Sequence, residues 1–315
     1  MDKIYTVMTL QQLEYIVALA RQRHFVKAAE QCGVTQPTLS AMILKLEEEL
    51  GVALFDRTKH PVEPTPIGEA VVGQAQVVLS NIAGLHEIIS QEKESLGGEL
   101  RMAVIPTVSP YLLPDFLHHF REHYPAVRLH IREMRTPVIL EQLRRAETDL
   151  AILATPLSEN EFFSIPLYYE KFAAYVSPLE EIYGKESLSA SDMPLDHLWV
   201  LQEGHCIRNQ VFNFCHEKAR TRQAYEAGSI DTLVKIVDRN GGYTVIPELH
   251  IGLLDETQRR NVRPIADPPA VREISIVIRR DFIRERMLNA VADTVKSVIP
   301  REMLDERLRK FAIRI

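Results

Sequence analysis

Segments with the pattern of strands alternate with segments with the pattern of helices from about residue 99 to the end of the sequence. The strands that this alternation predicts are 100–105, 127–134, 150–154, short strands around 165–177, 198–202, 243–246 and 273–278. The predicted helices are 109–124, 138–147, 206–219, 230–240 and a last helix from about residue 284. This pattern is typical of an α/β domain with parallel strands, whose ligands bind outside the carboxyl ends of the strands.

The first 60 residues have a different pattern, with three amphipathic helices. The apolar faces expected to pack together are Leu10, Leu13, Val17 and Ala20, then Phe25, Ala28, Ala29 and Cys32, then Leu39, Ile43, Leu46 and Leu50. Gly33 ends the second helix, and Thr35 is placed to cap the third, with Pro37 in its first turn. This order predicts a helix-turn-helix, although any small three-helix bundle has a similar core.

The exposed N-terminal side of the third helix offers side chains suited to base edges and phosphates, none of them acidic. These candidate DNA-binding residues are Gln36, Pro37, Thr38, Ser40 and Lys45. The basic segment 55–61 predicts a wing, in which Arg57 and Lys59 would contact phosphates. The acidic run 47–49 is expected to face away from DNA.

A long apolar seam follows residue 66. Its positions, spaced 4-3-4-3-4, are Val71, Ala75, Val78, Ile82, Leu85 and Ile89. A helix of this kind, roughly 45 Å long, must bury its stripe either on its own domain or against the same helix of a second copy. Because helix-turn-helix dimers bind half-sites about one DNA turn apart, we expect residues 67–96 to form a dimerisation helix. The glycines at 97–98 then provide a hinge.

Three predicted strands are followed by polar residues at the start of a helix. They are Thr107, Thr136 and the pair His205–Cys206. Helix N-termini favour anions, so their convergence predicts one site at the mouth of a cleft. Each residue also has a purely structural interpretation: Thr136 precedes Pro137 as a helix cap, and Thr107 lies near a helix start. His205 would in that case be a half-buried histidine with satisfied hydrogen bonds.

Cys206 and Cys215 lie nine residues apart in the sequence. The neighbouring His205 and Arg208 are expected to lower the pKa of the Cys206 thiol. If the segment is helical, the two sulfurs are separated by a rise of about 13 Å and face opposite sides, so a disulfide would require unwinding. Buried cysteines are more often inert packing residues, and Cys32 is interpreted in that way.

Composition adds limits on the class of protein. The chain of 315 residues is 46% apolar and 25% charged, with a net charge of −6, so overall charge gives no sign of a polyanion partner. Residues 1–66 contain seven Lys and Arg against eight Asp and Glu. We expect neither a signal segment nor a membrane span. With three cysteines the chain has no disulfide framework, which predicts a cytoplasmic protein with reduced thiols, and no metal or cofactor is expected.

The N-terminal motifs resemble a known family. Residues 10–58 are similar to the DNA-binding domain of LysR-type transcriptional regulators, with landmarks Ala28-Ala29, the run TQPTLS at 35–40, Lys45-Leu46-Glu47, Leu50-Gly51, Leu54-Phe55 and Arg57. The resemblance implies a winged helix-turn-helix over 1–66, a dimerisation linker helix over 67–96 and a regulatory domain over 99–315. That regulatory domain would be an α/β fold of two subdomains, similar to periplasmic binding proteins.

The C-terminal motifs narrow this resemblance. GHCIRNQVFNFC at 204–215 and IPTVSPYLLP at 105–114 resemble the redox segment and peroxide-pocket loop of the OxyR peroxide sensors, a branch of the LysR-type regulators. The resemblance implies a peroxidatic Cys206 and a resolving Cys215 joined by a reversible disulfide. The peroxide-binding residues that it implies are Thr107, Thr136, Gly204, His205 and Arg208. Asn209 departs from the pattern, because family members commonly carry aspartate there.

The function implied is that of a peroxide-sensing regulator of oxidative-stress genes, not an enzyme. Its partners would be double-stranded promoter DNA, RNA polymerase, hydrogen peroxide, a cellular thiol reductant and further copies of itself, as a dimer through the linker helix and as a tetramer. Two alternatives remain open at this point. The chain could be a LysR-type regulator that answers a small organic anion in the same cleft, or a thiol peroxidase.

Overall fold

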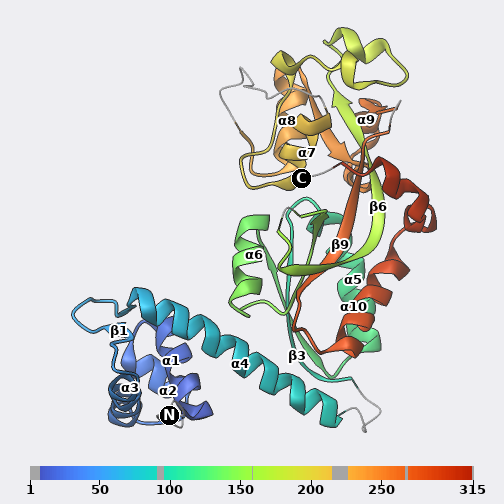
Figure 1. Ribbon diagram of the computed structural model, residues 1–315. Coiled ribbons are helices and arrows are strands. Elements are labelled where there is room, and N and C mark those ends of the chain that lie inside the picture. Colours follow the sequence, from blue (N-terminus) through green and yellow to red (C-terminus); the bar gives the residue numbers. More distant parts are fainter. Residues whose placement is uncertain (1–7, 91–95, 158, 215–225, 267–268, 314–315) are drawn as a thin grey trace. The chain divides into compact units, whose positions relative to one another are not determined.

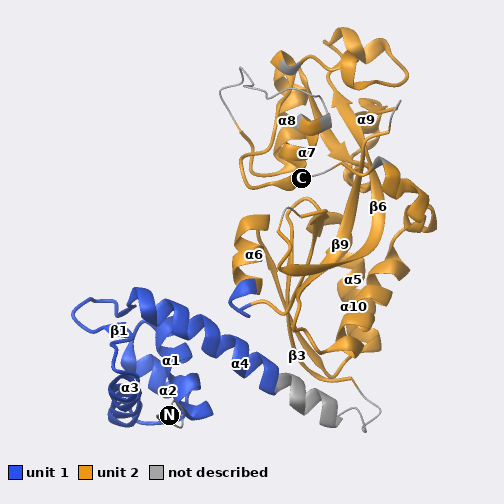
Figure 2. Cartoon of the chain, viewed as in Figure 1, with its two compact units in different colours: residues 1–92, 144–147 blue, residues 93–143, 148–315 orange. Residues whose placement is uncertain are grey.

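The structure is a computed structural model that describes residues 8–90, 96–157, 159–214, 226–266 and 269–313 (Figure 1). The chain divides into two compact units, one of residues 1–92 with 144–147 and one of residues 93–143 with 148–315 (Figure 2). Among the helices of the described residues, none combines the length and apolar character that crossing a membrane requires.

The N-terminal unit is a winged helix-turn-helix followed by a long helix. Its helices are α1 Leu10–Gln22, α2 Phe25–Gln31, α3 Gln36–Leu50 and α4 Pro66–Ser90. The wing is a two-stranded antiparallel sheet of β1 Phe55–Asp56 and β2 Glu63–Pro64. The helix order and the wing therefore match the predicted fold.

The local sequence explains how α3 begins. The Thr35 hydroxyl accepts a hydrogen bond from the backbone N–H of Thr38, and Pro37 occupies the first turn, where its missing N–H costs nothing. Gly33 lies between α2 and α3 with φ at +67°, a left-handed conformation that a side chain would disfavour. The turn of the helix-turn-helix thus depends on a glycine followed by a capping threonine.

The core of the N-terminal unit follows most of the predicted pattern. Leu39, Ile43 and Leu46 are buried, and Cys32 packs, partly buried, against the core, as its interpretation as a packing residue requires. Two predicted core residues are wrong, since Leu10 is 49% exposed and Leu50 is 36% exposed. Both lie at an end of their helix, where the periodic stripe continues past the neighbouring helices.

Glu47 is buried on α3 and fixes the wing. One carboxylate oxygen accepts the backbone N–H groups of Leu54 and Phe55, at 2.7 and 3.1 Å. The other accepts the Arg57 guanidinium at 2.8 Å. One residue of the acidic run at 47–49 is therefore an internal acceptor, which the charge pattern alone did not indicate.

The first half of the α4 seam packs on its own unit. Val72 and Ala75 belong to the core, and Val71 and Val78 pack against it partly buried. This is the alternative in which the stripe is covered within one chain. Dimerisation through Leu85 and Ile89 stays a prediction, because the structure does not describe the side chains of these two residues.

The second unit is built on a seven-stranded mixed sheet. Its strands are β3 Gly98–Val104, β4 Val127–Glu133, β5 Leu150–Thr155, β6 Phe162–Val176, β7 Tyr243–Pro247, β8 Val262–Pro264 and β9 Val271–Arg279. The order is β4-β3-β5-β9-β6-β7, with β8 paired to β6. The expectation of parallel strands holds only for β4, β3 and β5, because β9 and β6 pair antiparallel with their neighbours.

Two separate apolar cores divide this unit into two subdomains. Subdomain I packs α5 Ser109–His123, α6 Thr136–Arg144 and α10 Glu285–Val298 around β3 and β5. Subdomain II packs α7 Cys206–Phe214 and α8 Ile230–Asn240 around β7, while the short α9 Glu256–Arg259 follows β7 along the chain. Figure 1 shows β6 and β9 passing side by side through both subdomains. The predicted two-subdomain α/β regulatory fold is confirmed.

Two predicted strands differ from the structure. The short strands expected around 165–177 are one strand, β6, with a register shift between Pro166 and Tyr168. The strand expected at 198–202 is an irregular segment that touches its neighbours through two isolated bridges, at Leu198 and Leu201. A proline with its bulge interrupts the sequence pattern of a continuous strand, and an apolar run can be buried without pairing.

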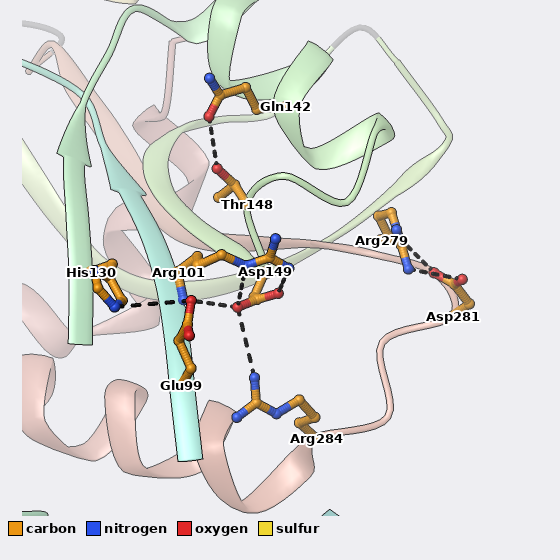
Figure 3. A network of polar contacts seen from close by, with 9 residues as sticks. All are labelled: Glu99, Arg101, His130, Gln142, Thr148, Asp149, Arg279, Asp281 and Arg284. Atoms are coloured by element: carbon orange, nitrogen blue, oxygen red, sulfur yellow. Dashed lines mark hydrogen bonds and ion pairs between the residues drawn. The ribbon is translucent and has the colours of Figure 1, made fainter. Parts of the chain in front are cut away.

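The start of β3 is tied to its surroundings by a buried carboxylate (Figure 3). Asp149 accepts the backbone N–H of Arg101 at 2.8 Å and its guanidinium at 2.6 Å, and Arg284 approaches to 3.7 Å. At the surface nearby, His130 lies 3.9 Å from Glu99. Three segments far apart in sequence are thereby held where the chain enters the regulatory unit.

The wing anchor leads to a testable prediction. Glu47→Ala leaves the buried N–H groups of Leu54 and Phe55 without an acceptor, which costs about 1–3 kcal/mol in local stability. We expect amide hydrogen exchange at 54 and 55 to accelerate by at least tenfold, while Glu48→Ala, at an exposed position of the same helix, leaves it unchanged. Equal exchange in the two variants would contradict the anchoring role.

Candidate redox site and DNA-reading face

Cys206 is the first residue of α7 and follows a tight turn. Gly204 in that turn has φ at +91°, and a Cβ atom there would lie 3.3 Å from the Cδ of Arg135. Arg135 in turn donates to the carbonyl of Glu203 at 3.0 Å. Gly204 is therefore required by both its conformation and its close neighbour, and it directs the chain so that Cys206 points into the protein.

The Cys206 thiol meets a residue of the other subdomain. Its sulfur lies 2.6 Å from the hydroxyl oxygen of Thr136, the first residue of α6. Cys206 is 5% exposed and belongs to the apolar core of subdomain I, whereas the next residue, Ile207, belongs to that of subdomain II. The start of α7 therefore lies at the junction of the two cores.

Behind the thiol lies a buried cation, Arg272 of β9. Its guanidinium donates to the Thr107 hydroxyl at 3.0 Å and to the Thr107 carbonyl at 3.1 Å. It also donates to the Tyr111 hydroxyl at 3.1 Å and to the Glu170 carboxylate at 2.8 Å. Arg272 is completely buried, so these partners replace all the water that an exposed guanidinium would bind.

Burial raises the pKa of the Cys206 thiol above its ordinary value. The Thr136 hydrogen bond and the positive charge of Arg272 act in the opposite direction and do not overcome the burial. The expectation that His205 and Arg208 lower this pKa is wrong. Burial, with help from Arg135, instead lowers the pKa of His205, so its imidazole is uncharged at neutral pH.

The predicted site residues are only partly brought together. Thr107, Thr136 and Cys206 gather around Arg272, and His205 is buried directly before the thiol. Arg208 lies on α7 and donates to the carbonyl of Leu201 at 3.3 Å and to Glu226 at 2.5 Å. Asn209 is exposed, and Cys215 lies outside the described residues.

Sequence reasoning missed Arg272. The strand expected to start at residue 273 in fact begins at Val271, so the arginine was placed just before it. A signal was present, because Arg272 and Glu273 lie within the β-branched segment 271–278, which is otherwise apolar except for Ser275. A charged residue inside a buried strand requires a partner and indicates a polar site.

The candidate DNA-binding residues differ in exposure and in their charge partners. Gln36, Pro37 and Thr38 are exposed at the start of α3. The two lysines are exposed and paired with acids, Lys45 at 3.8 Å from Glu49 and Lys59 at 2.7 Å from Glu63. Ser40 is half-buried, and Arg57 is 36% exposed while paired with Glu47.

The raised pKa of Cys206 leads to a prediction about its reactivity. A raised pKa leaves less thiolate at any lower pH, so iodoacetamide should alkylate Cys206 more slowly at pH 7 in the native protein than in urea. The native rate should still rise with pH where the unfolded thiol, with a pKa of about 8.5, has levelled off. Mass spectrometry of the Cys206 peptide measures both rates. A native profile that levels off at lower pH than the unfolded one would contradict the burial effect.

Two family models match this chain. The bacterial regulatory helix-turn-helix protein model of the lysR family matches residues 10–69, and the LysR substrate binding domain model matches residues 93–300. The hydrogen peroxide-inducible genes activator of Haemophilus influenzae is 36% identical over 299 residues, which cover 93% of this chain and 99% of that protein. The DNA-binding transcriptional dual regulator OxyR of Escherichia coli is 36% identical over 275 residues, covering 86% of this chain and 90% of that one.

Solved structures agree with these relatives. Full-length OxyR from Pseudomonas aeruginosa, in a cysteine-to-aspartate form, is 35% identical, with a TM-score of 0.81 and coverage of 92% of this chain and 96% of that chain. A hydrogen-peroxide-bound cysteine mutant of OxyR from Corynebacterium glutamicum is 29% identical, with a TM-score of 0.61 and coverage of 98% and 97%. The chain belongs to the LysR family of bacterial regulators, in the branch of the OxyR-type hydrogen peroxide-inducible genes activators.

Proposed function

We propose that this protein is a transcriptional regulator that senses hydrogen peroxide through Cys206 and controls oxidative-stress genes. The observation that carries the proposal is the Cys206 thiol, 2.6 Å from the Thr136 hydroxyl and under the positive charge of Arg272. A promoter-binding regulator of this kind acts in the cytoplasm, with RNA polymerase as its partner.

The first chemical step oxidises Cys206. The thiol loses its proton to solvent, and the thiolate sulfur attacks one oxygen of hydrogen peroxide. The S–O bond forms as the O–O bond breaks, and the leaving hydroxide takes up a proton to become water. Sulfur is oxidised by two electrons to sulfenic acid and the peroxide is reduced.

The residues around the thiol supply binding and polarity for this step. The Thr136 hydroxyl can donate to the thiolate or to a peroxide oxygen beside it, and Thr107 presents a second hydroxyl that Arg272 orients. Gly204 shapes the turn, and the uncharged His205 can accept a proton or donate one. Arg208, on α7, donates to the carbonyl of Leu201 and to the carboxylate of Glu226 and thereby supports the start of the helix.

The second step forms the disulfide that switches the protein. The Cys215 thiolate attacks the sulfenic sulfur, an S–S bond forms, and hydroxide leaves as water after protonation. Cys206 lies at the start of α7, which is helical to Phe214, so bringing the two sulfurs together requires that the helix unwind. A cellular thiol reductant returns both cysteines to thiols.

The unwinding is what couples chemistry to transcription. Cys206 packs in one core, while Ile207 and Val211 pack in the other, so unwinding α7 changes contacts in both subdomains. We propose that this alters the regulatory interface between copies of the chain, which pair through the linker helix and assemble as a tetramer. The spacing of the DNA-reading domains on promoter DNA changes as a result.

Neither alternative function is favoured by the site. The Arg272 donors are directed at Thr107, Tyr111 and Glu170, which leaves this cation poorly placed to bind an organic anion. The helix-turn-helix unit argues against a thiol peroxidase, because that activity does not require a DNA-binding domain. Steady-state turnover of peroxide with a thiol reductant tests the enzymatic alternative directly.

Cysteine substitutions test the sensing chemistry. Cys206→Ser should abolish peroxide-dependent transcription and leave DNA binding intact, because the DNA-binding and sensing residues lie in separate units. Cys215→Ser should stop the reaction at the sulfenic acid, detected as a gain of 16 Da by mass spectrometry, roughly one oxygen atom. Cys32→Ser serves as the control and should respond as the wild type does. A peroxide response that survives Cys206→Ser would refute the proposal.

The DNA-reading face is tested by comparing specific with random DNA. Thr38→Ala and Ser40→Ala should weaken binding to the specific site by about 1–3 kcal/mol each, through lost base or phosphate contacts. Arg57→Ala should weaken binding to both DNAs and reduce the salt slope by about one. Fluorescence anisotropy at several salt concentrations measures these effects. If all three variants lost the same affinity for specific and for random DNA, the assignment of α3 as the recognition helix would be contradicted.

A further inference from the structure

Glu170 and Arg272 face each other as a direct cross-strand pair of β6 and β9. Both side chains are completely buried, and the carboxylate lies 2.8 Å from the guanidinium. The pair lies where the strands pass between the two cores, since Tyr168 belongs to the core of subdomain I and Phe172 to that of subdomain II. The cation that faces the thiol is therefore bound to an anion of its own.

The Glu170 carboxylate is fixed from several directions. One oxygen accepts from Arg272 and from the Tyr111 hydroxyl at 3.1 Å, and the other accepts the backbone N–H of Leu249 at 2.9 Å. These bonds favour the charged carboxylate. The Glu170 carboxylate is consequently held in place beside Arg272.

The negative charge of Glu170 offsets the effect of the positive charge of Arg272 on Cys206. An unpaired arginine in a buried site would stabilise a nearby thiolate strongly, because opposite charges attract most where water is excluded. With Glu170 in place, ionising Cys206 adds a second negative charge to one positive charge. Burial is the main cause of the raised pKa of the Cys206 thiol, and the paired guanidinium of Arg272 offsets it only in part.

The other titratable groups around the pair do not add a positive charge that could stabilise the Cys206 thiolate. Burial raises the pKa of Tyr111 and Tyr168, so both stay protonated and neutral. Burial also lowers the pKa of His205 and of His250, whose Nε2 lies 3.5 Å from Asp231. Arg135 lies near His205, where it acts on that imidazole.

We propose that Glu170 is a positioning residue that sets the sensitivity of the sensor: it holds Arg272 in place and balances its charge, so that Cys206 reacts with peroxide more slowly than it would beside an unpaired cation. The inference rests on the proposed function of Cys206 as the peroxide-reactive residue. It assigns Glu170 a role through Arg272, without contact to the reacting atoms.

Glu170→Gln tests this role, because glutamine keeps an acceptor for Leu249 or Tyr111 and removes the charge. We expect the pH profile of Cys206 alkylation by iodoacetamide to move down by about one unit, which gives about ten times more thiolate at neutral pH. The rate of reaction with hydrogen peroxide at pH 7 should rise by a similar factor. Both are measured on the full-length, reduced protein.

Glu273→Gln is the matched control. Glu273 is the next residue on β9, is also buried and bonds to Thr155 at 2.6 Å. Successive strand residues point to opposite faces, so its carboxylate faces away from the Arg272 guanidinium. Its substitution should leave the alkylation profile in place. A shift equal to that of Glu170→Gln would show a nonspecific effect of buried charge and would overturn the proposal.

A double variant covers the case in which Glu170→Gln does not fold. Glu170→Gln with Arg272→Met removes both charges and replaces the pair with groups of similar size, an exchange that buried ion pairs often tolerate. The pH at which its alkylation rate rises should equal or exceed that of the wild type, and a shift to lower pH would overturn the proposal. A folded Glu170→Gln variant whose pH profile of Cys206 alkylation is unchanged would also overturn the proposal.

The two readouts separate the inference from the function on which it rests. Alkylation reports ionisation of Cys206 without any peroxide. If wild-type Cys206 fails to react with peroxide, the proposed function falls while the effect of Glu170 is still measured. If Cys206 reacts with peroxide but its alkylation profile is the same in the wild type and in Glu170→Gln, only the inference about Glu170 is refuted.

Discussion

The buried ion pair of Arg272 and Glu170 is the interaction on which the regulatory unit depends. Two charges removed from water must be paired and fully hydrogen-bonded, or the cost is several kcal/mol. Arg272 meets this demand with Thr107 and Tyr111 in addition to Glu170, and so joins α5 to the two crossing strands. The same contacts that satisfy a buried charge therefore position a hydroxyl and a positive field beside the thiol.

The junction of two cores gives the site its capacity to act on the fold. A thiol inside a single core would change only its immediate packing when oxidised. Cys206 instead bonds to Thr136 of subdomain I and begins a helix whose Ile207 and Val211 pack in subdomain II. Under the proposed function, oxidation of this sulfur would therefore act on the packing of both subdomains at once.

Local sequence signals predicted most of the architecture, because they act over a few residues. The Thr35 cap, the turn at Gly33 and the buried Leu39, Ile43 and Leu46 of α3 lie where their patterns placed them. Features that depend on contacts between distant segments could not be predicted in this way. The antiparallel pairing of β9 depends on which strands become neighbours, and strand patterns carry no direction.

The site shows the same division between local and non-local information. Thr107, Thr136 and Cys206 were predicted to converge because each follows a strand, and the structure brings them together. The ionisation of the thiol was predicted wrongly, since proximity in sequence said nothing of the direction in which Arg208 points. Burial and a cation from β9 decide that property, and both follow from tertiary packing.

Glu47 has a consequence for how a promoter is recognised. Its carboxylate belongs to α3, yet it binds the backbone and a side chain of the wing, so hydrogen bonds couple these two elements directly. If α3 enters the major groove and the wing contacts the neighbouring backbone, we expect the two contacts to form together. Local groove width should then affect how well α3 reaches the base edges.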